Sequence, residues 1–346
     1  MTESEPYLSI VAVSRNDDHG GNLLQRMQLF VDALYAQCNR FKLKTELIII
    51  EWNPLSDRQG LKDALTWPED RGCVVTRIIT VSPDLHNQFK YADKMPIFQM
   101  IGKNVGIVRA KGHFILATNI DILFSDELMQ YLTKKMLNDG CHYRVDRVDV
   151  DSCVMAEYTK DTLLSCCRKN ILRLNKKYGT YGYRSKWDSL SVSLKSFMDY
   201  VYRAKVEKSD GYPLTHSNAC GDFALMAKSD WMKLGGYPEL EMYSFHIDSM
   251  ILVAGHYSGI REVDLASPME IYHIEHSAGS GWTPGKGEQQ LFERLGKNGV
   301  PYLVWADILR YARELRDTHD PAQTFIGKNK PGWGLVDHEL PETIIR

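Results

Sequence analysis

The side chains best suited to chemistry stand at the end of a patterned stretch that runs from Lys103 to Asp121. Small residues punctuate a helix-like segment, an apolar run of strand length covers Phe114 to Ala117, and Asn119 and Asp121 follow it directly. Ligands of open α/β sheets bind beyond the carboxyl ends of the strands. Because hard divalent cations take carboxylate and phosphate oxygens, the pattern predicts a site for a diphosphate and its cation after this strand.

A series of strands and helices must position these side chains. Leu8 to Val13 is an apolar run of strand length that ends in a polar loop, and apolar residues at helical spacing follow from Leu23 to Leu34. The same patterns predict strands over 46–50, 74–81 and 114–117 and a helix over 97–108. This alternation predicts an α/β fold with a Rossmann-like, mostly parallel sheet and helices on both faces.

The second half of the chain has a different pattern of apolar and polar residues. His142 to Val150 alternates imperfectly, as a half-exposed strand does. Residues 159–178 fit a helix with one apolar and one basic side. A solvated basic side is one interpretation, and peripheral contact with anionic lipid or a phosphate-bearing acceptor is the other. Tyr302 to Leu315 fits a helix, which an extended tail follows.

Composition sets broad limits on function. The chain has 346 residues, 44% of them hydrophobic, and a formal net charge of −2. Nucleic-acid-binding proteins normally carry a strongly basic domain, so this charge argues against a nucleic-acid partner. Seven cysteines without a C-x-x-C pair indicate thiols in a reducing compartment. Without a signal-peptide pattern or an apolar run of about 18 residues, the sequence predicts a cytoplasmic protein with no transmembrane segment.

Short polar and glycine motifs follow one another in a definite order. They are Ser14-Arg15-Asn16-Asp17, Glu51, Lys103-Asn104-x-Gly106, Ala110-x-Gly112, Asn119-x-Asp121, Gly221-Asp222-Phe223, Leu234-Gly235-Gly236-Tyr237 and Asp248. This order resembles the GT-A-fold glycosyltransferases, notably the family-2-like enzymes, over residues 7–276. The resemblance implies transfer of a sugar from a UDP-, GDP- or dTDP-linked donor to a glycan or lipid-linked glycan acceptor. It also implies a nucleotide-sugar-binding half at 1–126, an acceptor-binding and catalytic half of the same domain at 127–295, and a C-terminal helix and tail at 296–346.

The resemblance further implies where the donor binds. The loop after the first strand and the end of the second would hold the nucleobase and ribose, whose donor groups suit carboxylates. Asn104 would lie close to the same nucleotide, Asp222 would line the donor-sugar or acceptor pocket, and Trp282 would cover the donor from a glycine-rich lid. The nucleotide-sugar-binding residues implied in this way are Arg15, Asn16, Asp17, Glu51, Lys103, Asn104, Arg109, Asn119, Asp222 and Trp282.

In this family a D-x-D signature holds a divalent cation, and here it reads Asn119-Ile120-Asp121. One carboxylate supplies less charge than two, yet Asp121 and the diphosphate still offer the oxygens that Mg²⁺ or Mn²⁺ takes, and Mn²⁺ tolerates an imidazole. The family's further ligand is often a late histidine, so His273 and His276 are the candidates. Because the residues around them favour a strand, we expect the two to point to opposite sides, with His276 as the ligand.

Family members commonly carry the catalytic base within a Glu-Asp pair that precedes a helix. Here Ile247-Asp248 stands in that place, after His246. The resemblance therefore implies an inverting enzyme with Asp248 as base and His246 as its assistant, and a helix N-cap is the alternative role of Asp248. Because both acidic signatures are altered, a catalytically degenerate carbohydrate-binding or scaffold protein is the alternative function. The sequence has neither the G-x-G-x-x-G nor the P-loop motif that nicotinamide enzymes and P-loop proteins require.

Overall fold

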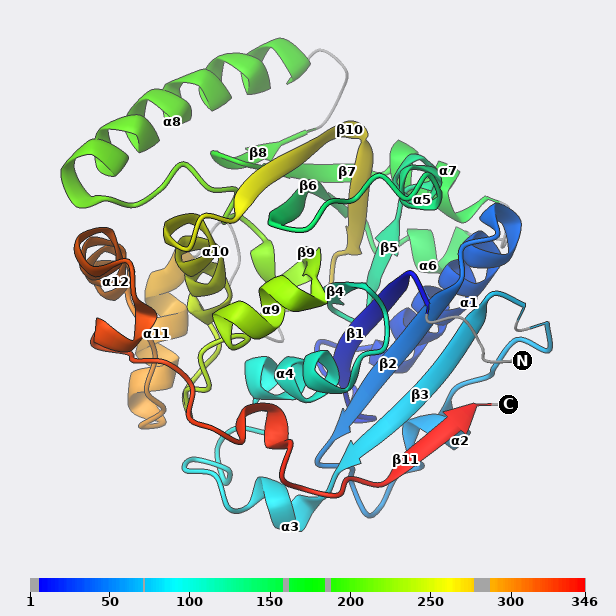
Figure 1. Ribbon diagram of the computed structural model, residues 1–346. Helices are drawn as coiled ribbons and strands as arrows, with labels where there is room; N and C mark the ends of the chain where they lie inside the picture. The colour runs from blue at the N-terminus through cyan, green and yellow to red at the C-terminus, as the bar shows by residue number, and fades with distance from the viewer. Residues whose placement is uncertain (1–5, 71, 158–161, 184–187, 277–286, 346) are drawn as a thin grey trace.

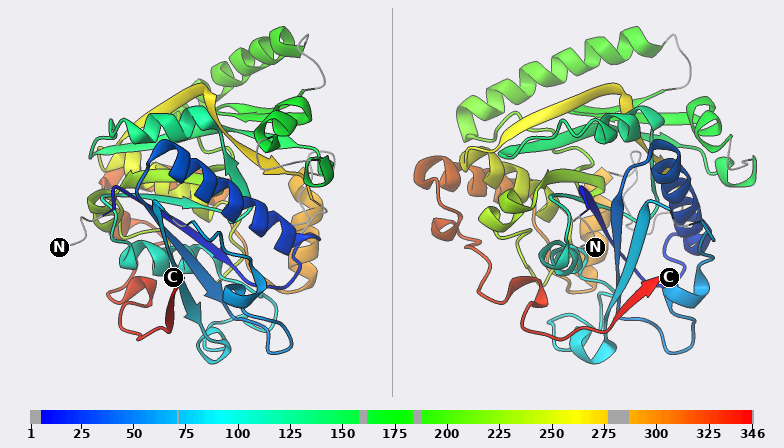
Figure 2. Two further views of the ribbon diagram at one scale, coloured as in Figure 1. Left: turned by 90° about the vertical axis from the view of Figure 1, so that its right-hand side faces the viewer. Right: turned by 45° about the vertical axis from the view of Figure 1, so that its right-hand side comes forward.

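The computed structural model describes residues 6–70, 72–157, 162–183, 188–276 and 287–345. A mixed sheet runs through the molecule in the order β11-β3-β2-β1-β4-β9-β6-β10-β5, and β7 and β8 extend it from β6 (Figure 1). Helices cover both faces of the sheet (Figure 2). This arrangement confirms the predicted α/β class.

The parallel part of the sheet contains the strands of the first third of the chain. They are β1 (Leu8–Ser14), β2 (Thr45–Trp52), β3 (Val74–Val81) and β4 (Phe114–Thr118). β1 pairs in parallel with both β2 and β4, and β3 pairs in parallel with β2. Every residue of β1 is buried, and successive side chains alternate between two core clusters: Val11 and Val13 face one, Ile10 and Ala12 the other. Burial on both faces explains the nearly continuous apolar runs.

Each of the two core clusters lies between the sheet and one layer of helices. One layer contains α1 (Leu23–Phe41) and α5 (Asp126–Thr133), and the other contains α4 (Gln99–Arg109), α9 (Lys228–Leu234) and α10 (Ile247–Tyr257). The glycines of α4 allow a close approach to the sheet. A Cβ at Gly102 would lie 2.8 Å from Cγ1 of Val13, and one at Gly106 would collide with Val11. The small residues seen in the sequence are therefore packing requirements of α4.

The remaining strands form a largely antiparallel part. They are β9 (Phe223–Ala227), β6 (Cys141–Val150), β10 (Arg261–Ile274), β5 (Ile122–Phe124), β7 (Ile171–Lys176) and β8 (Gly179–Gly182). β9 pairs antiparallel with β4, and β5 pairs antiparallel with β10. In the second pairing His273 lies opposite Ile122. The end of β10 is thereby brought to the segment that follows β4.

The predicted basic helix over 159–178 is wrong. Within the described residues of that stretch, α7 covers only Leu163–Lys169, and the chain then enters β7, which pairs with β6 and β8. Four of its basic side chains, Arg168, Arg173, Lys176 and Lys177, are held in ion pairs, such as those of Arg168 with Glu127 (2.6 Å) and Lys177 with Glu262 (2.5 Å). Hydrogen bonding to β6 overrides the helical spacing of the apolar residues, because Ile171 and Leu174 serve a strand equally well.

Other elements complete the described chain. They are α2 (Leu61–Ala64), α3 (Pro83–His86), α6 (Val154–Glu157), α8 (Asp188–Asp210), α11 (Gly287–Lys297), α12 (Trp305–Thr318), β11 (Glu342–Ile345) and the 3-10 helices η1 (Cys220–Asp222), η2 (Pro321–Gln323) and η3 (Trp333–Leu335). The helix and extended tail predicted near the C-terminus correspond to α12 and to β11, which pairs antiparallel with β3. Among the described helices, none combines the length and the apolar character that crossing a bilayer requires.

Candidate active site and metal centre

The candidate site lies at the carboxyl ends of the parallel strands. Ser14 at the end of β1 pairs with Glu51 at the end of β2, and β4 runs beside β1 in the same direction. Asn119 and Asp121 follow β4 directly. The loops after these three strands therefore leave the sheet at one edge, as the sequence predicts.

Asp121, His273 and His276 form a cluster at this edge. One ligand atom from each of the three side chains can be chosen so that all lie within 4.8 Å of one another. The expectation that only one histidine faces the site is wrong. β10 ends at Ile274, so His276 lies beyond the strand and escapes its alternation, and the two imidazole rings lie 5.1 Å apart between centroids.

The chemistry of this donor set fits a divalent cation. A carboxylate is a hard oxygen ligand, and imidazole suits transition metals better than it suits Mg²⁺, so one carboxylate with two imidazoles favours a transition-metal ion such as Mn²⁺ over Mg²⁺. Nδ1 of His273 is buried and makes no hydrogen bond in the described part of the chain, although it lies 3.5 Å from Oδ1 of Asp149. A carboxylate beside a histidine ligand is a frequent means of fixing the ring.

A buried arginine, Arg26, contacts the same carboxylate. Its Nη1 donates to Asp121, and its Nη2 donates to the carbonyl oxygens of His19 (2.6 Å) and Gly21 (3.3 Å) in the loop after β1. Burial alone would raise the pKa of Asp121, but the charges of His273 and Arg26 outweigh burial and lower this pKa below its ordinary value. Asp121 therefore stays ionised and available to a cation.

Arg26 was missed in the sequence, although a signal for it exists. It lies on the buried side of α1, three residues after Leu23 and one before Met27, and its side chain is only 1% exposed. An arginine at a core position of an amphipathic helix needs a buried partner. Here that partner is Asp121, which is 95 residues away in the sequence.

A chain of polar contacts links the end of β4 to His273. Nδ2 of Asn119 donates to Oδ1 of Asp222 (2.5 Å), and Nη1 of Arg147 donates to Oδ2 of the same carboxylate (2.5 Å). Arg147 also pairs with Asp149 (2.9 Å), which lies beside His273. Burial raises the pKa of Asp149, but His273 and Arg147 outweigh it and hold this pKa well below the ordinary value. These contacts hold the histidine and the amide in fixed positions.

Lys103 and Asp248 form a second polar group behind Asp222. Nζ of Lys103 donates to the carbonyl oxygen of Gly221 (2.6 Å), and burial lowers the pKa of this lysine to about 8. Burial raises the pKa of Asp248, while the charge of Lys103 opposes the increase. A Cβ at Gly221 would lie 2.8 Å from Oδ2 of Asp248, so the glycine makes room for the carboxylate.

Asp248 is not the helix N-cap considered in the sequence. His246 occupies the N-cap of α10 with a left-handed backbone (φ 68°), and Asp248 lies in the first turn. The His246 ring lies beside those of Phe245 (4.4 Å between centroids) and Trp305 (6.1 Å). Burial lowers the pKa of His246 to about 4, so this histidine is neutral at physiological pH. Its assistance to Asp248 stays a prediction.

The loops after β1 and β2 are tied together at the same edge. Nη1 of Arg15 donates to the carbonyl oxygen of Asn53 (3.1 Å), and Nε of Arg15 donates to Asp17 (2.7 Å). Nδ2 of Asn16 donates to the carbonyl oxygen of residue 59 (3.0 Å). Glu51 is buried and accepts from the backbone N–H of residue 61 (2.6 Å), so its carboxylate also holds the loop after β2. The nucleotide contacts expected of these residues stay predictions.

Two of the described sequence-predicted residues, Asn104 and Arg109, do not join the polar residues at the carboxyl ends of the parallel strands. Asn104 is fully buried and exchanges hydrogen bonds with the backbone of Tyr237 (2.8 and 2.9 Å), so it fixes the Gly-Gly-Tyr turn. Arg109 ends α4 and donates to the carbonyl oxygens of Gly334 (2.7 Å) and Leu335 (2.6 Å) in the C-terminal segment. Trp282 lies outside the described residues. The glycine packing of α4 explains why the Asn-x-Gly motif marks structure at this place.

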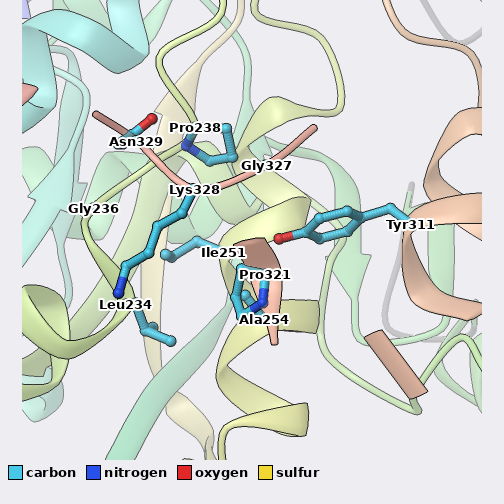
Figure 3. Close-up of a pocket in the computed structure, with 10 residues that line it drawn as sticks. All are labelled: Leu234, Gly236, Pro238, Ile251, Ala254, Tyr311, Pro321, Gly327, Lys328 and Asn329. Atoms are coloured by element: carbon cyan, nitrogen blue, oxygen red, sulfur yellow. The ribbon is translucent and has the colours of Figure 1, made fainter. Parts of the chain in front are cut away.

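A small cavity lies apart from the cluster of Asp121, His273 and His276. Figure 3 shows it between Tyr311, Ile251 and the segment that carries Lys328. Its volume of about 20 Å³ suffices for a water molecule and is far too small for a nucleotide. None of the residues that line it is among those predicted to bind the donor.

Two glycosyltransferases are among the solved structures that are similar to this chain. The mannosyltransferase PcManGT from Pyrobaculum calidifontis, in complex with GDP-Man and Mn²⁺, has 12% sequence identity and a TM-score of 0.44, and the match covers 92% of this chain and 72% of that one. GalNAc-T7 with UDP, GalNAc and Mn²⁺ gives the same identity and TM-score and covers 92% of this chain. The chain spans about half (51%) of the length of GalNAc-T7. No protein-family model matches the sequence, and no curated protein matches it.

Proposed function

We propose that the protein is a GT-A-type glycosyltransferase that uses a nucleotide-diphosphate sugar and a divalent cation and acts on a glycan or lipid-linked glycan acceptor. The observation that carries the proposal is the cluster of Asp121, His273 and His276 at the carboxyl edge of β4. The loop after β1, where the resemblance expects the nucleotide, reaches the same cluster through Arg26. A cation site next to such a loop suits a diphosphate that both would bind.

In this proposal Asp121, His273 and His276 hold the cation, with Mn²⁺ favoured over Mg²⁺. When bound, a divalent cation neutralises the negative charge that develops on the departing nucleoside diphosphate. Asn119 and Asp222, joined by their 2.5 Å hydrogen bond, would face the donor sugar. The network through Arg147 keeps both in place before the donor arrives, which lowers the cost of ordering the site.

Asp248 is the proposed base of an inverting reaction. Its carboxylate would take the proton of the acceptor hydroxyl while the bond from the anomeric carbon to the diphosphate breaks. A base works best when its pKa approaches the operating pH. Burial moves the pKa of Asp248 in this direction, and the charge of Lys103 opposes the change.

Release of nucleoside diphosphate tests the proposed reaction. The purified chain is incubated with UDP-, GDP- and dTDP-linked sugars with and without Mn²⁺, and water serves as the acceptor of the sugar in place of the glycan. We expect release from one nucleotide class, dependent on Mn²⁺. Absence of release from every donor, at Mn²⁺ concentrations that saturate the protein, would contradict the proposal.

The pH dependence of kcat tests the base. The rate should fall as the pH is lowered through the pKa of Asp248, because the protonated carboxyl cannot accept the hydroxyl proton. Asp248→Asn should lower kcat by about 10² to 10⁴ with little change in KM for the donor. Asp139→Asn, which alters an exposed carboxylate paired with His113, is the control and should leave the pH profile unchanged.

The degenerate carbohydrate-binding or scaffold protein remains the second candidate function. The observation in its favour is Arg26, whose guanidinium already neutralises the single carboxylate of the cluster. Under this alternative, titration calorimetry would show saturable binding of a nucleotide sugar or glycan while no nucleoside diphosphate is released. The same donor screen therefore separates the two candidates.

A further inference from the structure

Helix α8 lies along an outer edge of the molecule (Figures 1 and 2). One side of it is anchored to the protein. Val192 is buried, Asp199 accepts from the hydroxyl of Tyr181 (2.7 Å), and Asp210 pairs with Arg313 (2.8 Å). These contacts fix the orientation of the helix and determine which face it turns outward.

The outward face of α8 is apolar. Apolar side chains recur along the helix at positions 190, 194, 197 and 201, which lie on one stripe. Positions 198 and 202, next to this stripe, are apolar as well. These side chains are Leu190 (80% exposed), Leu194 (62%), Phe197 (62%), Met198 (63%), Val201 (39%) and Tyr202 (64%). Contiguous exposed apolar surface of this kind marks a contact with a membrane or another protein.

The charges on the same helix distinguish between these partners. Of the described charged side chains of α8, the exposed ones are Lys195, Lys205 and Lys208, and all are cationic. Its acidic side chains are half-buried on other sides, as with Asp199 and Asp210 in their contacts to the protein. Exposed lysines without an exposed acidic side chain among the described residues of α8 favour a partner that carries negative charge. An anionic bilayer satisfies both the apolar stripe and the lysines.

We propose that α8 is a membrane-surface helix that docks the protein on an anionic bilayer. The helix would lie in the plane of the interface, with the apolar stripe among the acyl chains and the lysines at the phosphate level. At 23 residues it spans about 34 Å along that plane. The proposal does not depend on catalysis, because none of the residues of the metal cluster belongs to α8.

Vesicle binding of the full chain tests this inference. Sedimentation with vesicles of phosphatidylcholine and phosphatidylserine, in a ratio of about three to one, should pellet the protein, and pure phosphatidylcholine should bind it at least about tenfold more weakly. Leu194→Glu with Phe197→Glu should lower the partition coefficient by at least about tenfold. Replacement of Lys195, Lys205 and Lys208 by Gln should lower it by about a hundredfold, and raised salt should have the same direction of effect.

Met136→Glu is the matched control, because it places a charge on an exposed apolar residue (57% exposed) outside α8 and should leave binding unchanged. Circular dichroism confirms that each variant is folded. Vesicle binding that is unchanged in the α8 variants would overturn the proposal. It would also be overturned by a wild-type chain that ignores the vesicles and instead forms a dimer that Leu194→Glu dissociates.

Discussion

Two clusters of charged side chains lie toward opposite ends of the parallel strands, and they differ in how fully their polar atoms are satisfied. Toward the amino ends, Arg77 donates from all three nitrogens to Glu342, Glu46 and the carbonyl oxygen of Arg109, at 2.7 to 2.9 Å. At the carboxyl ends, Nε of Arg26 and Nδ1 of His273 are buried without a hydrogen bond in the described chain.

The difference is the one expected between a structural ion cluster and a site prepared for a ligand. Unsatisfied buried polar atoms cost free energy, so a protein retains them where a function requires them. The Arg77 cluster joins β2, β3 and β11 and leaves nothing for a ligand to do. In the cluster around Asp121, Nε of Arg26 is a donor that a diphosphate could use, and Asp149 beside Nδ1 of His273 leaves the other ring nitrogen for the proposed cation.

The largest expected effect is the loss of activity in Asp121→Ala. Release of nucleoside diphosphate should fall on the order of a thousandfold, because the carboxylate of the cation site is removed. Stopped assays with the preferred donor and Mn²⁺ measure it. Asp139→Ala, at an exposed ion pair, is the control, and an equal loss in both variants would contradict the comparison.

Arg77→Met should lower the stability of the fold, whereas Asp121→Ala lowers activity. Removal of the guanidinium leaves Glu46 buried without a charge partner, which should lower the free energy of unfolding by about 3–5 kcal/mol. Urea denaturation measures the change. Arg40→Met removes an exposed partner of Asp126 and should cost about 1 kcal/mol or less. If Arg77→Met were as mild as this control, the cluster would not have the structural role assigned to it.

Binding of Mn²⁺ should stabilise the folded protein. At a free concentration of a hundred times its Kd, the ion should raise the free energy of unfolding by about 2.7 kcal/mol. The double variant His273→Ala with His276→Ala should lose this gain, whereas His113→Ala, at an exposed histidine, should keep it. Thermal unfolding with and without Mn²⁺ measures the shift, and a gain that persists in the double variant would place the ion elsewhere.

The smallest effect is expected from Asp149→Asn. The variant should lower Mn²⁺ affinity by about 10- to 100-fold, because the carboxylate that fixes His273 is neutralised. Titration calorimetry measures the affinity. Asp146→Asn, which alters a carboxylate on the same strand paired with Lys176 (3.1 Å), should leave the affinity unchanged. Equal affinities in the two variants would show that Asp149 does not position the histidine.

The parallel part of the fold could be predicted because its strands are buried on both faces and read as apolar runs. β3 has the bounds expected from the sequence, and α4 and β4 lie within two residues of theirs. The antiparallel part was harder to predict, since the apolar spacing of 163–174 fits both a helix and the observed α7 and β7. Tertiary pairing decides such cases.

The candidate site likewise contains residues that could be predicted from the sequence and others that could not. Asp121 and the two histidines could be proposed from their residue types, yet their convergence depends on the pairing of His273 with Ile122, which no local pattern shows. The role of Arg26 could not be predicted without knowing its partner, which is distant in the sequence. Asn104 was expected near the nucleotide because its motif resembles one in the family, whereas its amide is used up by the backbone of Tyr237.

The strand β11 has a practical consequence for work with this protein. Its residues Glu342–Ile345 cover the outer side of β3, and Glu342 also grips Arg77. Truncation before β11 would expose the backbone hydrogen-bonding groups along the outer edge of β3. It would also remove the carboxylate of Glu342 that pairs with Arg77. An uncovered strand edge is a template for aggregation, so shortened versions of the protein should keep Glu342–Ile345.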